Sequence, residues 1–390
     1  MKWHVQYGFQ QSHYDKCYLY LKRNGQFIKI SFHVDDGMVA HKGKQMWEQY
    51  KIDVNKRFDI QFHPLEERKK FLGMNFHLDR SKGICLIDQS NLVDKMLVDF
   101  GMQDCSTKVS TPCVWPLPTD SDLPESPGQH SEFNMYSALG YLNQLQGGTK
   151  PEISVPLKRL SRYGAHYGEK HIELAKRMMR WCKRTRNVPL VLKYAKQPEI
   201  QIFTDASHAS CPDTRRSITG VVVKISGNTI FWKCLNQSMV SHSSTESELI
   251  ALDKGATIGI YVRWLVECMT GTKYGTMKVF VDNQSTIALS SNPVHPDRNL
   301  HFHARFFYIR DLVEGKHYVV LHTPSEDMVS DILCTYKSIA NFNKLYAILV
   351  GVAHYELKDD GTYVWRMERG RWLQTASDQG GESKSQDSKE

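Results

Sequence analysis

Four acidic residues occupy the ends or starts of short apolar runs, where carboxylates can converge without flexing. They are Asp205, Glu248, Asp282 and Asp331. The first and third follow Gln201–Thr204 and Met277–Val281, which are typical of buried strands, and the second precedes the helix-like stretch Leu249–Ile260. Converged carboxylates repel one another, so they need cations between them. Two Mg²⁺ ions about 4 Å apart satisfy that charge and are a device for cutting phosphodiesters.

Each of these acids also has a simpler structural explanation when it is taken alone. Asp205 could cap a turn, and Glu248 could stabilise the N-terminus of its helix through the helix dipole. Their shared context favours a metal site, because three of the four adjoin strongly apolar runs and three have a small or hydroxyl residue beside them.

A second acidic site is the pair Asp35–Asp36 in the segment SFHVDDGMVA. Adjacent aspartates on a hairpin corner between apolar strands are similar to the metal-binding turn of a polymerase palm, where two carboxylates hold Mg²⁺ ions. The same DDG sequence is also an ordinary turn. The pair alone does not decide between these two interpretations.

The composition is that of a globular protein of two or three domains, with 390 residues, 41% of them apolar and 24% charged. The net charge of +8 permits a polyanionic partner without requiring one. No apolar run reaches the roughly 18 residues of a membrane span, and the N-terminus lacks the apolar core of a signal peptide. The nine scattered cysteines show no CxxC pattern, which favours reduced thiols in an intracellular protein of the cytoplasm, the nucleus or both.

The N-terminal third is expected to mix strands and helices. Residues 1–40 predict a β-meander, and Phe71–His77 with Gly83–Asp88 predicts a hairpin. Ser90 is expected to cap the next helix. The stretch from 110 to 131 is rich in Pro, Ser, Asp and Gly, which predicts a linker or a long surface loop.

The clearest helix is His171–Arg184, which has an apolar face and a cationic one. Its cationic residues are Lys176, Arg177, Arg180, Lys183 and Arg184. This surface is either a solvated face on a helix packed against the core or a surface that follows the phosphates of a nucleic acid.

From Glu199 onward, strands alternate with helices, which predicts a mixed sheet covered by helices. Two of the expected helices, Glu246–Ala256 and Ile258–Thr270, follow each other directly. The polar tail from Ser377 is predicted to be disordered.

Many separate blocks, in one order, resemble the C-terminal part of the Pol polyprotein of copia-type LTR retrotransposons. FHVDDGMVA is similar to the YVDD box of its reverse transcriptase, and FLGMNFHLDRSKGICLIDQSNLVDKMLVDFGM to the segment where the palm ends and the thumb begins. The STPC segment, YSALGYLNQL and HIELAKRMMRWCKRT continue in the family's order. The block from IFTDASHAS to STESELIAL then resembles the family's RNase H domain.

The resemblance implies roles for individual residues. Asp205, Glu248, Asp282 and Asp331 would be the metal-binding acids of RNase H, holding two Mg²⁺ ions, with Mn²⁺ as an alternative. Glu248 is preferred to Glu246 because it directly precedes the apolar helical run. Asp35 and Asp36 would be the paired palm aspartates. The residues expected to bind nucleic acid are Arg177, Arg180, Lys183, Arg184, Arg215 and Arg216.

Several features depart from the family pattern. The fingers and the palm strand with the remaining metal-binding aspartate normally precede residue 1, so we expect a truncated polymerase, doubtful DNA synthesis by this chain alone, and a role for a partner chain that supplies the missing parts. His33 replaces the tyrosine of the YVDD box. In LHFHARFFYIRD, His301 is kept, but His303 stands where an acid is usual and Phe307 replaces a histidine.

The histidines near Asp331 are weaker candidates for the metal site. They are His301, His303 and His322. Hard oxygen ligands suit Mg²⁺ better than imidazole. His301 is expected to serve in proton transfer or in structural support, and the sequence does not choose between them.

The predicted fold class is α+β or α/β, a truncated reverse-transcriptase palm and thumb followed by an RNase H-like mixed sheet flanked by helices. The expected divisions are palm and thumb start 1–110, linker 111–132, helical thumb or connection 133–197, RNase H-like domain 198–336 and an unassigned extension 337–390. The predicted function is Mg²⁺-dependent hydrolysis of RNA in RNA·DNA hybrids, with no membrane partner. The alternatives are a catalytically inactive or co-opted nucleic-acid-binding protein and a remnant without function.

Overall fold

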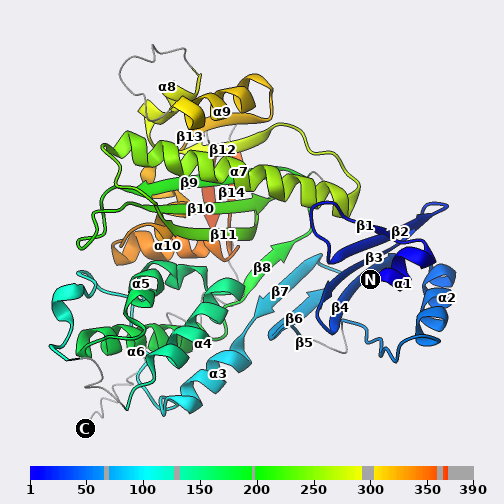
Figure 1. Ribbon diagram of the computed structural model, residues 1–390, viewed down its shortest axis with the longest axis horizontal. Helices are drawn as coiled ribbons and strands as arrows, with labels where there is room; N and C mark the ends of the chain where they lie inside the picture. Colours follow the sequence, from blue (N-terminus) through cyan, green and yellow to red (C-terminus); the bar gives the residue numbers. More distant parts are fainter. Residues whose placement is uncertain (66–69, 127–131, 196–197, 292–302, 358–362, 368–390) are drawn as a thin grey trace, which may run out of the picture.

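The computed structural model describes residues 1–65, 70–126, 132–195, 198–291, 303–357 and 363–367. Two four-stranded sheets, a bundle of helices and a five-stranded sheet follow one another along the chain (Figure 1). The predicted disorder of the tail from Ser377 lies outside the described residues. No helix among those described is long and apolar enough to cross a membrane.

The first sheet is an antiparallel meander in the order β1-β2-β3-β4. Its strands are β1 Gln10–Gln11, β2 Tyr18–Arg23, β3 Gln26–His33 and β4 Asp36–Lys42. Helix α2 (Lys44–Asn55) buries Tyr50 and Val54 against it. The prediction of a meander throughout 1–40 is wrong at its start, because Lys2–Tyr7 forms helix α1. That helix places aromatic rings against Tyr50, and His4 Nε2 lies 2.9 Å from the Tyr50 hydroxyl.

The second sheet has the order β5-β6-β7-β8, in which the last strand comes from a distant part of the chain. Its strands are β5 Lys70–Phe71, β6 Met74–Asp79, β7 Ile84–Asp88 and β8 Leu190–Lys193. The single strand predicted over Phe71–His77 is broken by Leu72 and Gly73, which both have positive φ. Ser90 is not the cap of the next helix; its amide donates to the Asp88 carboxylate at 2.8 Å.

The helices that follow pack around one apolar core. They are α3 Ser90–Asp99, α4 Met135–Gly148, α5 Ser154–Leu160 and α6 Glu169–Arg184. The stretch predicted as a linker or surface loop is irregular, but it is not only a surface segment, since Cys113 and Leu117 are buried in this core. Their apolar side chains sit between the prolines and serines that dominated the composition.

The third sheet carries three antiparallel strands and two parallel ones in the order β11-β10-β9-β12-β13. Its strands are β9 Ile200–Ser207, β10 Ile218–Ile225, β11 Asn228–Asn236, β12 Met277–Val281 and β13 Tyr318–His322. Successive side chains of β9 point to opposite faces, so Ile202 packs under α7 (Ser244–Thr270) while Phe203 joins the core shared with the helical region. The expected mixed sheet flanked by helices, and with it the α+β fold class, is confirmed.

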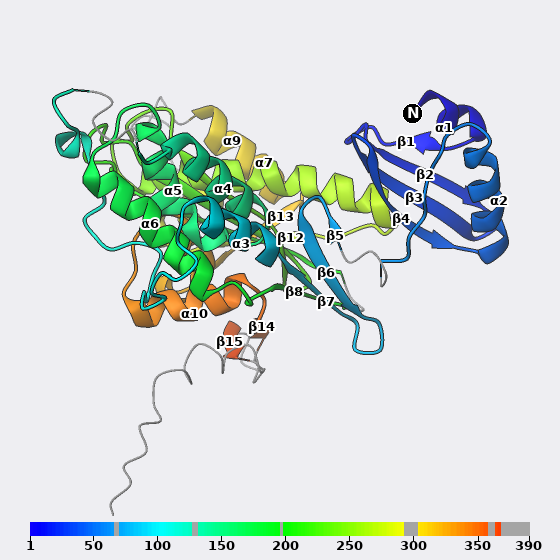
Figure 2. The same cartoon turned by 90° about the horizontal axis from the view of Figure 1, so that it is seen from below.

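Helix α7 is one continuous helix of 27 residues rather than the two that were predicted. Thr257, at the expected break, stays helical, with its hydroxyl donating to the Asp253 carbonyl at 2.9 Å. The far end of α7 reaches the first sheet, where the Tyr18 hydroxyl donates to the Met269 carbonyl at 3.2 Å and Trp264 stacks on Tyr14 (Figure 2).

The remaining elements complete the third sheet and extend beyond it. They are α8 Gln284–Ser291, α9 His303–Glu314, α10 Ile339–Leu349, β14 Ala353–Leu357 and β15 Tyr363–Met367. Helix α10 packs into the core shared by the helices and the third sheet. The fully buried ammonium of Lys224 on β10 donates to the Ile348 carbonyl at its C-terminal end, at 2.7 Å.

Candidate metal centre

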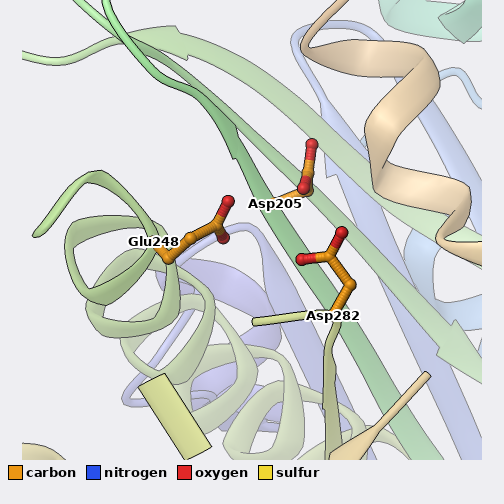
Figure 3. A group of neighbouring side chains, drawn as sticks. All are labelled: Asp205, Glu248 and Asp282. Atoms are coloured by element: carbon orange, nitrogen blue, oxygen red, sulfur yellow. The ribbon is translucent and has the colours of Figure 1, made fainter. Parts of the chain in front are cut away.

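Three carboxylates from three different elements converge at one edge of the third sheet. Asp205 lies near the end of β9, Glu248 lies in the second turn of α7, and Asp282 directly follows β12. Figure 3 shows the three side chains pointing toward one another, and one oxygen from each lies within 4.8 Å of the others. Strands β9 and β12 are parallel neighbours, so the two aspartates leave the sheet at the same edge.

Glycines let α7 approach β9 closely enough to bring Glu248 to Asp205. A Cβ atom added to Gly255 would lie 2.1 Å from Thr204 Cγ2, and one added to Gly259 would lie 2.2 Å from Ile202 Cδ1. These distances are shorter than any van der Waals contact, so a larger residue would push the helix away from the strand.

Asp205 and Glu248 are buried, and neighbouring charges raise the pKa of each. Asp205 is 5% exposed and Glu248 is 6% exposed. Burial, and then the charges of Asp205 and Asp282, raise the pKa of Glu248 to about 10. Burial, together with Asp331 and Asp282, raises the pKa of Asp205 well above its usual range. Such carboxylates become fully ionised near neutral pH only if a cation joins them.

One atom of the cluster lacks a partner within the described part of the chain. Glu248 Oε1 accepts a hydrogen bond from the Ala206 amide at 3.2 Å, which orients the carboxylate. Glu248 Oε2 is buried and has no hydrogen-bond partner there. Buried polar atoms are normally satisfied, and carboxylate oxygens are the ligands that Mg²⁺ prefers. The residues present therefore fit a divalent metal ion.

Asp331 lies beside the cluster but faces a different cation. It belongs to a short 3-10 helix, Val329–Leu333, and its carboxyl group lies within hydrogen-bonding reach of the Asp205 carboxyl. Its Oδ2 forms an ion pair with Lys337 Nζ. Burial raises the pKa of Asp331, while Lys337 opposes that rise. The structure thus brings all four predicted acids together, with the fourth held by a lysine.

Glu246 has a structural task that separates it from Glu248. Its amide donates to Ser243 Oγ at 3.1 Å, and its carboxylate accepts a hydrogen bond from the His242 amide. The Ser243 hydroxyl thus satisfies one free amide of the first turn of α7, and the Glu246 carboxylate satisfies an amide just before the helix. Glu246 therefore points back along the chain and not into the cluster.

The Asp35–Asp36 pair lies on the hairpin between β3 and β4, at the other end of the molecule from the cluster. Asp36 begins β4, opposite His33, and Val34 at the tip of the turn is 86% exposed. The first sheet contacts Met269, and the rise of an α-helix puts that residue about 30 Å along α7 from Glu248.

The predicted nucleic-acid-binding residues fall on two surfaces. Lys183 on α6 donates to the carbonyls of Gln103 and Cys105, at 2.5 and 2.7 Å, and Arg180 pairs with Glu173 at 3.3 Å. Arg184 donates to the Thr107 carbonyl at 3.4 Å. Arg180, Lys183 and Arg184 thus already bond to other groups of the protein, whereas the buried Nε of Arg177 has no hydrogen-bond partner among the described residues.

Arg215 and Arg216 are exposed on the loop between β9 and β10. Asp213 of the same loop accepts hydrogen bonds from Arg159 at 2.9 Å and Arg162 at 2.6 Å, which ties the loop to helix α5 and the turn after it. The loop is therefore fixed against the helical region while its two arginines face solvent.

Of the three histidines considered as weaker metal-site candidates, only the side chain of His322 lies within the described part of the structure. His301 lies outside the described residues, and the surroundings of the His303 side chain lie outside them too. His322 is exposed at the end of β13.

Two residues at the site were not predicted from sequence. Ser325 donates to Asp282 Oδ2 at 2.7 Å, and Lys337 pairs with Asp331. Neither lies next to an apolar run that ends in an acid, so the pattern that found the carboxylates could not find them.

Comparisons with known proteins place the chain among transposon polyproteins. The family profile described as reverse transcriptase (RNA-dependent DNA polymerase) matches residues 2–114. A retrovirus-related Pol polyprotein from transposon TNT 1-94 of Nicotiana tabacum is 28% identical over 331 residues, which cover 83% of this chain and 24% of that protein. An uncharacterized mitochondrial protein of Arabidopsis thaliana is 31% identical over 182 residues, which cover 47% of this chain and 73% of that protein.

Among solved structures, an RNase H1 isolated from compost is 17% identical, with a TM-score of 0.28, and the match covers 38% of this chain and 99% of that one. The chain spans between 22% and 24% of the length of three transposon polyproteins that it matches.

Proposed function

Because this chain belongs to the copia-type family of LTR-retrotransposon Pol polyproteins, we propose that its third sheet carries an RNase H-type site that hydrolyses RNA in RNA·DNA hybrids with divalent metal ions. The observation that supports the proposal most is the convergence of Asp205, Glu248 and Asp282 within 4.8 Å. The buried, unpartnered Glu248 Oε2 adds to it.

Each acid has a distinct place in the proposed site. Asp205 would bridge two ions, Glu248 and Asp282 would complete one position, and Asp331 would complete the other. Divalent ions held by these residues would supply activation of the attacking water and stabilisation of the leaving 3′-oxygen. The Ala206 amide holds Glu248 and the Ser325 hydroxyl holds Asp282, so both carboxylates are oriented before any ion enters.

The substrate class follows from family membership and from the exposed charge near the site. Arg215 and Arg216 would contact backbone phosphates of the hybrid. RNA would be distinguished from DNA through its 2′-hydroxyl groups in the minor groove. The Asp35–Asp36 hairpin stays the predicted polymerase-type metal pair and takes no part in this reaction.

Two neighbouring glutamates on α7 give a matched test. Glu248→Gln should lower Mg²⁺-dependent cleavage of a labelled RNA·DNA hybrid by at least about a hundredfold, since losing even an outer partner of a metal ligand costs roughly 10–100-fold. Glu246→Gln keeps an oxygen acceptor for the His242 amide and should leave the rate within about twofold, because the Ser243 cap of α7 survives. Single-turnover cleavage assays with both variants measure the difference.

Two results would count against the proposal. Equal losses in both variants would mean that the helix start, and not a metal ligand, was damaged. No cleavage by the unaltered chain, with salt-sensitive hybrid binding intact, would replace the nuclease with a nucleic-acid-binding protein that lacks turnover.

A further inference from the structure

Lys337 gives the acidic cluster a cation of its own. Its Nζ forms an ion pair with Asp331 Oδ2, and the two side chains are 18% and 8% exposed. The backbone holds both ends of this pair: the amides of Cys334 and Thr335 donate to the Asp331 carbonyl, and Ser338, next to Lys337, caps α10 through the Asn341 amide. The lysine is therefore anchored beside the site by a short, ordered segment.

Lys337 lies nearer to one of the four carboxylates, Asp331, than to the group formed by the other three. Asp205, Glu248 and Asp282 form the group in which one oxygen of each lies within 4.8 Å of the others, whereas the ion pair of Lys337 is with Asp331. Asp331 adjoins the group through Asp205. An ion held by Asp205 and Asp331 would thus share a ligand with an ammonium, and like charges in a largely buried setting repel strongly.

We propose that Lys337 is a tethered cation that makes the two metal positions unequal. One divalent ion binds tightly among Asp205, Glu248 and Asp282. The second, at Asp205 and Asp331, binds weakly because it must displace the Lys337 ammonium. The inference rests on the metal site of the proposed function and adds which position is weak and why.

The test counts bound Mn²⁺, which does not depend on activity. The electron paramagnetic resonance signal of free Mn²⁺ is titrated with the full chain, to give two dissociation constants. The unaltered protein should show one tight and one weak site. Lys337→Met should tighten the weak site by about tenfold, within the range usual for coupled sites, and leave the tight site unchanged. Lys337→Arg keeps the charge and should behave like the unaltered protein.

Lys344→Met is the matched control, because Lys344 forms a similar pair with Asp327 at 2.5 Å that does not involve the four acids. It should change neither constant. A weak site that stays unchanged in Lys337→Met overturns the inference, as does equal tightening in Lys344→Met. If Lys337→Met fails to fold, Lys337→Arg still tests the inference. A weak site that binds Mn²⁺ more tightly in Lys337→Arg than in the unaltered protein would overturn it.

The two proposals can fail separately. If Asp205→Asn abolishes Mn²⁺ binding while Lys337→Met leaves both constants unchanged, the metal site stands and the tethered-cation inference falls. If neither the unaltered chain nor Lys337→Met binds Mn²⁺, both fall.

Discussion

Several ionisable side chains of this protein are buried, and each needs a partner that balances its charge. Glu248 and Asp205 are buried together, so their negative charge demands cations. Lys224 presents the opposite case, since its ammonium is buried inside β10 and burial lowers its pKa to about 7. The Ile348 carbonyl accepts its hydrogen bond but supplies no full negative charge.

Replacing Lys224 should stabilise the protein most at low pH. Unfolding restores the usual pKa of 10.5, so below about pH 7 the folded state must bury a proton that water would solvate better. That cost is fully present below pH 7 and disappears as pH rises to 10.5. Lys224→Met should therefore raise the free energy of unfolding by on the order of 2–4 kcal/mol at pH 6 and by much less at pH 10.

Urea denaturation across this pH range measures the difference. Lys278→Met is the control, because Lys278 on β12, a strand of the same sheet, is partly exposed and pairs with Glu199 at 2.5 Å. A gain at Lys224 that did not change with pH would contradict the burial argument.

At the residue scale, the sequence revealed the carboxylates but not their counter-ions. Asp205 and Asp282 adjoin apolar runs that could only be buried strands, so their convergence was predictable. Lys337 lies in an irregular segment and Ser325 begins a short 3-10 helix, and the path of both depends on tertiary packing. Local pattern carries no information on such placements.

Among the elements, α7 depends on glycine to meet the sheet. Gly255 and Gly259 lie one turn apart on the face toward β9, which a Cβ on either would strike. Replacing a helical glycine with alanine usually stabilises a helix by about 0.5–1 kcal/mol. At Gly255 and Gly259, however, an added Cβ would clash with side chains of β9, so the same replacement should lower the stability of the protein.

Gly255→Ala should therefore destabilise the chain by about 1–3 kcal/mol and weaken Mn²⁺ binding by displacing Glu248. Gly140→Ala on α4 is the matched control: a Cβ there meets no atom within 4 Å, so this change should be stabilising. Thermal denaturation and Mn²⁺ titration of both variants give the answer. Stabilisation of equal size at both positions would contradict the clash between α7 and β9, because it would show that a methyl group fits at Gly255.

Element types were largely predictable, and element ends were not. The apolar spacing of α6 and the strands after Glu199 was clear in the sequence. The break predicted within α7 is absent because Thr257 finds a carbonyl on its own helix. The missed helix α1 is short and owes its shape to aromatic contacts with Tyr50, a residue far along the chain.

On the scale of the whole molecule, the described residues form three apolar cores. The first sheet has its own core, whereas the helical region and one face of the third sheet share another. The division at 110, 132, 197 and 336 stays a prediction. Because the helical region and the third sheet share one apolar core, each fixes the position of the other.

The loop that carries Arg215 and Arg216 is held against the helical region by Asp213, so we expect the binding of an RNA·DNA hybrid to depend on these two arginines. In a Glu248→Gln background, changing both arginines to alanine should reduce the slope of log binding constant against log salt by roughly two, since each lost phosphate contact contributes about 0.9. Fluorescence anisotropy over a salt series measures the slope.

Lys56→Ala with Arg57→Ala is the control pair, adjacent and exposed like the first but in the turn after α2, the helix that packs on the first sheet. An equal fall in slope for both pairs would assign binding to net charge and not to the loop between β9 and β10.

The contact between Lys224 and α10 bears on how the gene can be dissected. A shortened version ending at residue 336, where the RNase H-like domain was expected to stop, would discard α10 and with it the Ile348 carbonyl that accepts a hydrogen bond from Lys224. It would also uncover apolar side chains of the shared core. Expression work on the third sheet should therefore carry the coding sequence through at least Val352, whose amide donates to the Ala347 carbonyl.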